Sequence, residues 1–250
     1  MRAAGLDIGS RSIELVILDG EGRETVATER IATTPTVAED CRRLVATASF
    51  DRLVVTGYGR AMAEVAFGYP SVTEIKAYAR GAEDVRPGCR SVLDIGGQDT
   101  KAIALDGTGR ALRFEMNDRC AAGAGRFLEM MASALDYDIA SFGAGAVRGD
   151  GSVKINSMCA VFAESEVVGL LTRGLRREDI ALAVHQVVAS RAAAMLIRVS
   201  REAPIVFAGG AARNPCLVAL VEQAVGGPVF VPKDPEMLGA RGAALIALEG

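Results

Sequence analysis

The chain has 250 residues, of which 50% are hydrophobic and 28 are glycine, and its formal net charge is −3 with a pI near 5.4. This weak acidity gives no reason to expect binding to nucleic acid or to an anionic membrane surface. No uninterrupted apolar run approaches the roughly 18 residues of a membrane-spanning helix. The opening residues MRAAGLDIGS lack the apolar region and cleavage site of a signal peptide, so we expect a cytoplasmic protein.

The amino terminus of the chain is repeated near its middle. Residues 6–23 read LDIGSRSIELVILDGEGR and residues 93–110 read LDIGGQDTKAIALDGTGR, so the two stretches align without a gap. The offset is constant, since 94 − 7 = 87 and 106 − 19 = 87. Each copy predicts a hairpin made of a buried strand, a glycine turn and a second strand. A chain of this length with two such hairpins is expected to form two similar α/β domains.

The two hairpin turns have the composition of phosphate-binding loops. Their glycines let backbone N–H groups approach an anion closely. Hydroxyl and amide side chains add donors at Ser10, Ser12, Gln98 and Thr100. The carboxylates of Asp7 and Asp94 repel a bare phosphate, which indicates a bridging cation such as Mg2+. Ordinary tight hairpins with Asp-Gly turns are the alternative, and the matched pair favours nucleotide binding.

Two helices and one strand are expected between the hairpins. Apolar residues at helical spacing predict a helix over residues 36–48, and residues 50–56 have the pattern of a buried strand. Residues 72–85 predict a second helix. Pro87 and Gly88 end that helix, so we place the domain boundary there.

Cys120 and Cys159 occupy matching positions in the sequence. Residues 114–119 and 153–158 are strand-like, and each run leads into a cysteine followed by the apolar spacing of a helix. Helix amino termini carry partial positive charge and unpaired N–H donors, which favour a thiolate over a thiol. A single cysteine in this setting is often a small buried apolar residue. Two cysteines in the same setting favour ligands of an anionic assembly.

Two thiolates do not complete a common metal site, because structural zinc and iron–sulfur clusters generally take four ligands. Cys41 lies within a helix, Cys89 lies at the domain boundary, Cys216 follows a proline, and no CxxC spacing indicates a disulfide framework. The single histidine, His185, lies in an apolar helical stretch and is expected to pack rather than to bind metal. A symmetric homodimer would supply four thiolates on its twofold axis. A cluster shared between two subunits is therefore our hypothesis.

The last third of the chain alternates helices and short strands. A long helix over residues 180–198 is expected to cover the second sheet, and a strand over residues 204–207 leads to the glycine pair at 209–210. Residues 229–231 predict a last short strand. The final helix, over residues 236–248, contains small residues that permit close helix packing.

Three motifs resemble the superfamily of acetate and sugar kinases, heat-shock chaperones and actin. They are DIGS in the first turn, DIGGQDTK in the second turn and FAGGAARN after the penultimate strand. The resemblance covers nearly the whole chain and implies two ribonuclease-H-like domains with ATP and Mg2+ in the cleft between them. Residues 1–88 would form the first domain, residues 89–235 the second, and residues 236–250 a helix at the hinge.

The same resemblance implies which residues contact the nucleotide. Asp7 and Asp94 would organise Mg2+ and its waters, and Gln98 or Asp99 would orient the attacking water. The expected nucleotide-binding residues are Gly9, Ser10, Arg11, Ser12, Gly96, Gly97, Gln98, Lys101, Gly209, Gly210, Arg213, Asn214 and Glu236. Those of the two hairpin turns would bind phosphates, and those near the carboxyl terminus would border the adenosine.

The sequences around the two cysteines, NDRCAAGAGRFLE and SMCAVFAESEV, resemble the activator family of 2-hydroxyacyl-CoA dehydratases, which includes the ATP-binding subunits of benzoyl-CoA reductase. The resemblance extends to TGYGR at residues 56–60 and EIKAYARGA at residues 74–82. It implies a homodimer or pseudo-dimer with one 4Fe-4S cluster between the subunits. Cys120 and Cys159 of each subunit would hold that cluster.

The chain departs from the family pattern at three places. The family often has Lys or Thr-rich residues in the first phosphate loop, where this chain has Arg11, Ser12 and Glu14. Its usual GTGRF is GAGRF at residues 123–127, and a common histidine of the family is Tyr78 here. None of the three departures touches a cysteine expected to hold the cluster, and the first of them concerns the nucleotide contacts of the first loop.

The expected function is that of an ATP-driven electron donor. A reduced ferredoxin or flavodoxin would load the cluster, and one low-potential electron would pass, with ATP hydrolysis, to an iron–sulfur enzyme that dehydrates or reduces an acyl-CoA. The ATP-binding subunit of a benzoyl-CoA reductase, with distinct partner subunits, is one alternative. A sugar or small-acid kinase and a non-catalytic actin-like or chaperone-like nucleotide switch are the others, and both lack a cluster.

Overall fold

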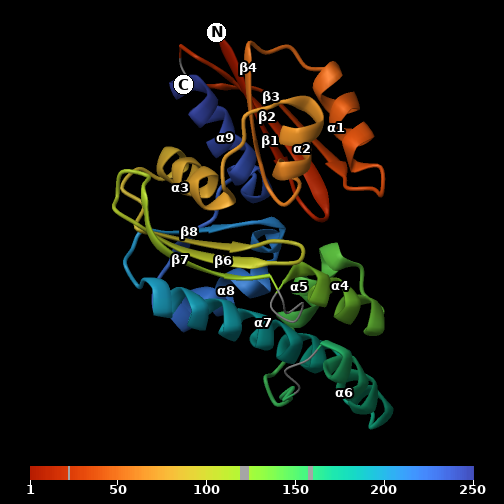
Figure 1. Ribbon diagram of the computed structural model, residues 1–250. Coiled ribbons are helices and arrows are strands. Elements are labelled where there is room, and N and C mark those ends of the chain that lie inside the picture. Colours follow the sequence, from red (N-terminus) through yellow and green to blue (C-terminus); the bar gives the residue numbers. More distant parts are fainter. Residues whose placement is uncertain (22, 119–123, 157–159) are drawn as a thin grey trace.

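The computed structural model describes residues 1–21, 23–118, 124–156 and 160–250. These residues form two lobes, each built on a β-sheet with helices packed against it, and both ends of the chain lie in the same lobe (Figure 1). The first sheet has the strand order β3-β2-β1-β4 and the second has the order β7-β6-β5-β8-β9. The α/β class and the two-lobed organisation predicted from the repeat are therefore confirmed.

The first domain is built on the amino-terminal hairpin. Its strands and first helices are β1 (Arg2–Ile8), β2 (Ser12–Asp19), β3 (Thr25–Ala32), α1 (Val37–Ala46), β4 (Arg52–Thr56) and α2 (Arg60–Phe67). Strand β1 pairs antiparallel with β2 and parallel with β4. Leu6, Ile8 and Ile13 pack with Cys41 and Leu44 of α1. The predicted helix in this region therefore covers one face of the first sheet.

Strand β3 and helix α2 were not expected from the sequence. β3 is an edge strand of the first sheet, and its residues are exposed apart from Ile31, which is half-buried. Its sequence TVATERIA consequently lacks the alternation of apolar and polar residues that marks a half-buried strand. Helix α2 is short and has Ala63 as its buried residue, so it carries little of the periodicity by which a helix is found.

The second domain repeats the arrangement of the first hairpin. Its strands are β5 (Ser91–Ile95), β6 (Thr100–Leu105), β7 (Ala111–Asn117), β8 (Ile205–Ala208) and β9 (Val229–Phe230). Strand β5 pairs antiparallel with β6 and parallel with β8, as β1 does with β2 and β4. Its helices are α4 (Gly125–Ala134), α5 (Ile139–Ala146), α6 (Ala160–Thr172), α7 (Arg177–Val199) and α8 (Pro215–Val225), with a 3-10 turn η2 (Gly210–Arg213).

One strand prediction is wrong within the residues that the structure describes. Residues 153–156 form no strand; Val153 and Ile155 instead pack into the core of the second domain. The backbone N–H of Asn156 donates to Oε1 of Glu166 on α6 at 3.1 Å. The alternation of apolar and polar residues here reflects burial beside helices, without a neighbouring strand to pair with.

Two helices lie between the sheets and pack against each other. Helix α3 (Glu74–Val85) comes from the first half of the chain, yet its Tyr78 and Ala82 pack on Val92 and Val206 of the second sheet. Helix α9 (Leu238–Glu249), which follows the 3-10 turn η3 (Pro235–Met237), ends the chain and packs on β1 and β4 of the first sheet. Each half of the sequence therefore gives one helix to the sheet of the other half (Figure 1).

The contact between α3 and α9 depends on glycine. A Cβ atom at Gly242 of α9 would lie 1.8 Å from the carbonyl oxygen of Ala77 on α3. A Cβ at Gly5 of β1 would lie 1.9 Å from the carbonyl oxygen of Ala240. The small residues of the predicted final helix thus allow the close packing expected of them. Its role as a hinge stays a prediction.

Helix α7 is the long helix predicted over residues 180–198, and it lies along the second domain (Figure 1). Among the described residues it is the one helix long and apolar enough to cross a membrane by length and composition, which is weak evidence. The core helix of a water-soluble domain passes the same test. Of its most apolar window, 61% is buried inside the protein, as expected for a helix that covers a sheet.

Candidate functional site

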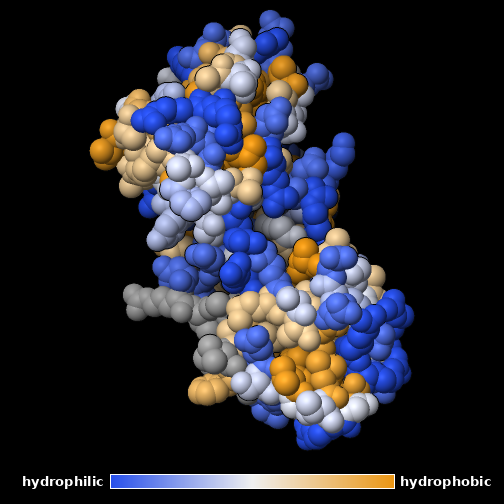
Figure 2. All heavy atoms as spheres, turned by 90° about the vertical axis from the view of Figure 1, so that its right-hand side faces the viewer, coloured by the Kyte–Doolittle hydropathy of each residue, from blue (hydrophilic) through white to orange (hydrophobic). Residues whose placement is uncertain are grey.

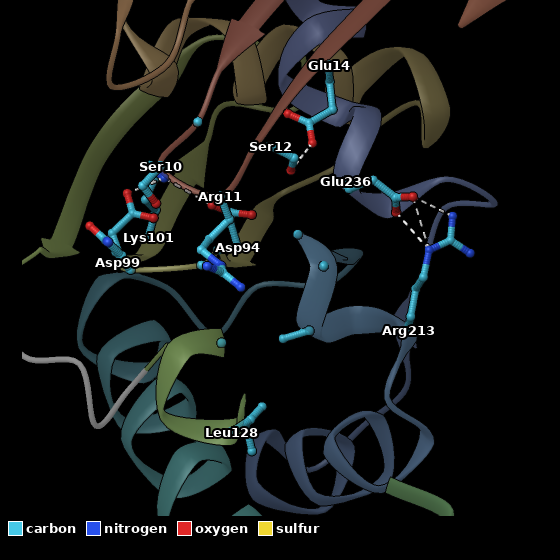
Figure 3. A pocket seen from close by; sticks show the side chains of 18 of the residues that line it. Ser10, Arg11, Ser12, Glu14, Asp94, Asp99, Lys101, Leu128, Arg213 and Glu236 are labelled. Atoms are coloured by element: carbon cyan, nitrogen blue, oxygen red, sulfur yellow. Dashed lines mark hydrogen bonds and ion pairs between the residues drawn. The ribbon is translucent and has the colours of Figure 1, made fainter. Parts of the chain in front are cut away.

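A cavity of about 610 Å³ lies between the two domains. Its size falls in the range of pockets that bind small molecules and cofactors. It is lined by both hairpin turns, by η2 and by the start of α4 and α5 (Figure 3). The residues expected to contact the nucleotide or Mg2+ line this cavity: Asp7, Gly9, Ser10, Arg11, Ser12, Asp94, Gly96, Gly97, Gln98, Asp99, Lys101, Gly209, Gly210, Arg213, Asn214 and Glu236. Thr100, expected as a further phosphate donor, is buried and does not line the cavity.

Lys101 is buried and surrounded by carboxylates. Its Nζ lies 3.1 Å from Asp94 Oδ2, 2.5 Å from Asp99 Oδ2 and 3.2 Å from Glu74 Oε1. Burial opposes the charged form of the amine, but these three carboxylates outweigh it and raise the pKa of Lys101. The lysine expected to bind phosphate is therefore held as a cation by acidic neighbours (Figure 3).

Asp94 is fully buried and only half paired. Its Oδ2 accepts from Lys101, whereas its Oδ1 is the buried side-chain oxygen without a hydrogen-bond partner among the described residues. Burial raises the pKa of Asp94 to about 6, against the lowering by Lys101. A buried carboxylate oxygen without a donor is costly, and it has the chemistry to accept from a hydrated divalent cation. The site thus fits the Mg2+ expected from the sequence.

Asp7 occupies the equivalent position in the first domain. A Cβ at Gly57 would lie 2.4 Å from Asp7 Oδ1, and one at Gly239 would lie 2.1 Å from Oδ2. In the second domain a Cβ at Gly209 would lie 2.5 Å from Asp94 Oδ1. Gly57 and Gly209 have positive φ and follow the parallel neighbours β4 and β8. The repeat therefore extends to the glycine that makes room for each aspartate.

The two copies of the repeat differ in charge at one position. Glu14 occupies the place that Lys101 occupies in the second copy, since 101 − 14 = 87. Glu14 is 5% exposed, accepts a hydrogen bond from Ser12 Oγ and lies 3.3 Å from Arg30 Nε. Burial raises the pKa of Glu14 to about 7. Ser12, an expected phosphate donor, is therefore engaged with Glu14 (Figure 3).

Arg213 and Glu236 face each other on the opposite side of the cavity (Figure 3). Arg213 Nε donates to Glu236 Oε2 at 2.9 Å and its Nη2 donates to Oε1 at 2.7 Å. Asp234 accepts from the same Nη2 at 3.2 Å. Glu236 also lies 3.9 Å from Arg30 of the first domain. The η2 and η3 turns are thus joined by a bidentate ion pair at the rim where adenosine is expected.

Asn214 has a structural task beside its expected contact with adenosine. Its Oδ1 accepts from the backbone N–H groups of Cys216 and Leu217 and so caps α8. Its Nδ2 lies 2.9 Å from Nε2 of His185, whose Nδ1 donates to the carbonyl of Ala181 at 2.7 Å. Burial lowers the pKa of His185 to about 4. His185 was expected to pack either in the core or at the surface, and the structure places it in the core, fully buried.

The sequence did not single out the apolar part of the cavity or several of its charged residues, Glu129 among them. Glu74 and Arg30 reach the cavity from α3 and β3, and their roles depend on the path of the chain in space. Apolar lining comes from Leu128, Ile139, Ala140, Ala211 and Pro215. The helix expected after Cys120 carries Leu128, but its face towards the cavity could not be predicted. The helices that carry Ile139, Ala140 and Pro215 were not expected from the sequence.

Cys120 and Cys159 lie outside the described residues, so their expected role as metal ligands stays a prediction. The described cysteines Cys41, Cys89 and Cys216 are free and buried. Burial raises the pKa of each of these three thiols to about 11. Within the described part of the chain, no group of three or more His, Cys, Asp or Glu residues is arranged to hold a metal ion.

Two lobes whose sheets share the same order over four strands, with paired acidic turns facing one cavity, define the fold of an actin-like ATPase with ribonuclease-H-like domains. The chain belongs to the BadF/BadG/BcrA/BcrD ATPase family, whose model matches residues 4–247. The 2-hydroxyisocaproyl-CoA dehydratase activator of Clostridioides difficile is 38% identical over 100% of this chain and 96% of its own length.

Two solved structures match the whole fold. The activator of the 2-hydroxyisocaproyl-CoA dehydratase from Clostridium difficile with bound ADPNP has a TM-score of 0.89 at 38% identity, over 100% of this chain and 95% of that chain. The Acidaminococcus fermentans (R)-2-hydroxyglutaryl-CoA dehydratase component A has a TM-score of 0.91 at 33% identity, over 100% of this chain and 98% of that chain. The predicted fold class and the resemblance to the dehydratase activators are therefore confirmed.

Proposed function

We propose that this protein is an ATP-dependent activator that transfers a low-potential electron from a 4Fe-4S cluster to an iron–sulfur acyl-CoA dehydratase or reductase. The observation that carries the proposal is full-length similarity to a dehydratase activator, combined with cysteine motifs of the activator family at Cys120 and Cys159. The interdomain cavity with its paired aspartates supports the nucleotide-dependent part of the proposal.

The nucleotide would bind between the two hairpin turns. Asp7 and Asp94 would hold Mg2+ through its waters, which is supported by the unpaired Oδ1 of Asp94. Gln98 or Asp99 would orient the attacking water, and catalysis would rest on positioning and charge neutralisation rather than on a single base. The adenosine would lie towards Arg213, Asn214 and Glu236, beside the apolar lining of the cavity.

The cluster would lie between two copies of the chain, held by Cys120 and Cys159 of each. When bound it supplies one electron at low potential. Helix α6 begins at Ala160, directly after Cys159, and exposes Phe162 by 68% and Val168 by 47%. Figure 2 views the side of the molecule on which α4, α5 and α6 lie and shows an apolar patch on the lower lobe. Exposed apolar side chains on α6, the helix that follows Cys159 in the sequence, support a subunit interface on this helix.

Coupling to ATP meets an energetic need. Making a one-electron donor more reducing by roughly 0.3 V costs about 7 kcal/mol at about 59 mV per tenfold change. The hydrolysis of ATP supplies free energy of this order. A ferredoxin or flavodoxin would deliver the electron in the cytoplasm, and the dehydratase or reductase component would receive it.

Iron and sulfide analysis of anaerobically purified protein tests the proposal. We expect about four iron and four sulfide per two chains, with brown colour. The variants Cys120→Ala and Cys159→Ala should lose the iron and keep nucleotide binding. Cys89→Ala and Cys216→Ala are matched controls, because these thiols are buried and neither residue lines the cavity, and they should keep the iron. Iron-free wild-type protein would overturn the proposal.

The alternatives differ in measurable ways. The ATP-binding subunit of a benzoyl-CoA reductase would purify with distinct partner subunits rather than as a homodimer. A sugar or small-acid kinase would hold no cluster, and its ADP formation would depend on an added acceptor. Affinity purification followed by mass determination separates the first alternative, and the iron analysis separates the second.

A further inference from the structure

Arg11 reaches from the first domain to a helix of the second. It lies in the turn between β1 and β2, and its Nη2 donates to Oε1 of Glu129 on α4 at 2.8 Å and lies 2.7 Å from Oε2. Glu129 lies in the middle of α4, the first helix after the segment that contains Cys120. The Arg11–Glu129 ion pair therefore connects the first phosphate loop to α4 across the interdomain cleft.

The stem of Arg11 lies against the second phosphate loop. A Cβ at Gly97 would lie 2.2 Å from Arg11 Cγ, so the absence of a side chain at Gly97 makes room for Arg11. Both residues line the cavity in which the phosphates are expected. A nucleotide whose terminal phosphate lies between the two turns would meet this guanidinium.

The start of α4 is attached to the same loop. The backbone N–H groups of Gly125 and Arg126 donate to the carbonyls of Gly96 and Gly97, each at 2.8 Å. No side chain caps the helix, so the loop carbonyls accept from these first donors, which a helix leaves unsatisfied. Helix α4 is thus joined to the second domain through its backbone and to the first domain through Glu129.

The Arg11–Glu129 ion pair is weak enough for Arg11 to leave Glu129 for another anion. The side chains of Arg11 and Glu129 are 45% and 32% exposed, and exposed ion pairs are weak. Glu129 has a second cation, Arg126, whose Nη1 lies 3.4 Å from Oε2 on the same helix. The carboxylate therefore keeps a partner when Arg11 leaves. A polyphosphate offers arginine more charge and a bidentate geometry, so it outcompetes a single exposed carboxylate.

We infer that Arg11 is a positioning residue shared between α4 and the bound nucleotide. Without nucleotide it joins α4 to the first domain through Glu129. With a triphosphate bound, its guanidinium moves to the phosphates, and α4 is released to follow the second domain alone. The inference deepens the proposed function, on which it rests in one respect: α4 follows the segment that carries Cys120, so its release would alter the surroundings of the proposed cluster.

Hydrogen–deuterium exchange of the α4 amides, with and without a non-hydrolysable ATP analogue, tests the inference on the full-length protein purified anaerobically. In the wild type, we expect exchange in α4 to rise when the analogue binds. In Glu129→Gln, exchange without analogue should already equal the analogue-bound level, and calorimetry should show up to about fivefold tighter binding because the competing carboxylate is neutral.

Two further variants distinguish the roles of the cations. Arg11→Gln should show the same high exchange in α4 and should lose its preference for the ATP analogue over ADP. Arg126→Gln is the matched control, since it removes a cation from Glu129 without crossing the cleft, and it should keep the nucleotide-dependent change. A wild-type exchange pattern in Glu129→Gln overturns the inference.

The iron content of the same preparations keeps the two proposals apart. If Glu129→Gln behaves as expected and the protein holds no iron, the positioning role of Arg11 stands and the electron-transfer proposal fails. If the protein holds its cluster, but the hydrogen–deuterium exchange of α4 changes neither on analogue binding nor in Glu129→Gln, the positioning role fails and the electron-transfer proposal stands.

Discussion

The charged residue that follows each hairpin turn differs between the two halves of the molecule. Lys101 is stabilised as a cation by Asp94, Asp99 and Glu74. Its counterpart Glu14 is buried beside Asp7, its partner in the β1–β2 register, with Arg30 as its nearby cation. Glu236 also faces Glu14 from η3 and raises its pKa further. The cleft is therefore electrostatically asymmetric although its backbone is repeated.

The raised pKa of Glu14 predicts a pH-dependent gain in stability for Glu14→Gln. The unfolded carboxyl has an ordinary value near 4.5, and the folded one titrates at about 7. The folded state therefore binds the proton more tightly, so stability is lost as pH rises from about 4.5 to about 7. Glu14→Gln should raise the free energy of unfolding at pH 8 by at most about 3 kcal/mol, and leave it nearly unchanged at pH 4.

Urea unfolding at the two pH values measures this difference. Glu29→Gln on β3 is the control, because Glu29 is an exposed carboxylate on the neighbouring strand. It should change stability little at either pH. An equal gain for Glu14→Gln at both pH values would show that charge burial is not the cause.

The residues of the site could be predicted from the sequence where the chain repeats itself. Asp7 and Asp94 stood out because the same Leu-Asp-Ile-Gly motif occurs twice, and the turn between two strands of a hairpin places its residues locally. The three partners of Lys101 could not all be predicted, because Glu74 arrives from α3, whose packing on the second sheet depends on the fold of the whole chain.

At the scale of elements, periodicity predicted those that bury one face. Helices α1, α3 and α7 have apolar stripes against a sheet and were expected close to their observed bounds. The edge strand β3 has hardly any buried face and was missed. The strand expected over residues 153–158 is absent at residues 153–156, the part that the structure describes. Val153 and Ile155 are buried in the core, but no neighbouring strand pairs with this segment.

The α3–α9 contact predicts that Gly242→Ala reverses the usual effect of alanine in a helix. Replacing a helical glycine by alanine ordinarily stabilises by roughly 1 kcal/mol. At Gly242 the new Cβ would lie 1.8 Å from the carbonyl oxygen of Ala77, so the two helices must separate. We expect a loss of about 1 to 3 kcal/mol, as for overpacking, measured by thermal or urea unfolding.

Gly169 on α6 is the matched control for this substitution. A Cβ there meets nothing within 4 Å, so Gly169→Ala should be neutral or stabilising. The pair of variants separates helix propensity from helix packing. A gain in stability for Gly242→Ala would mean that α3 and α9 are not pressed together as described.

At the scale of the molecule, the proposed cluster predicts an assembly that depends on iron. Anaerobic protein should sediment as a dimer, because thiolates from two copies share one cluster. Iron chelation should shift the mass towards that of one chain, as should Cys120→Ala, while Cys216→Ala keeps the dimer. If iron-containing protein keeps the same mass after chelation, the cluster lies within one chain or the subunit interface lies elsewhere.

Each half of the chain covers its sheet with a helix from the other half, α9 on the first sheet and α3 on the second. Neither half can therefore bury its own sheet alone. A gene divided after Pro87 would yield an amino-terminal fragment whose first sheet lacks α9 and a carboxyl-terminal fragment whose second sheet lacks α3. Each fragment would display an apolar sheet face to water, so the two must be made together to be recovered.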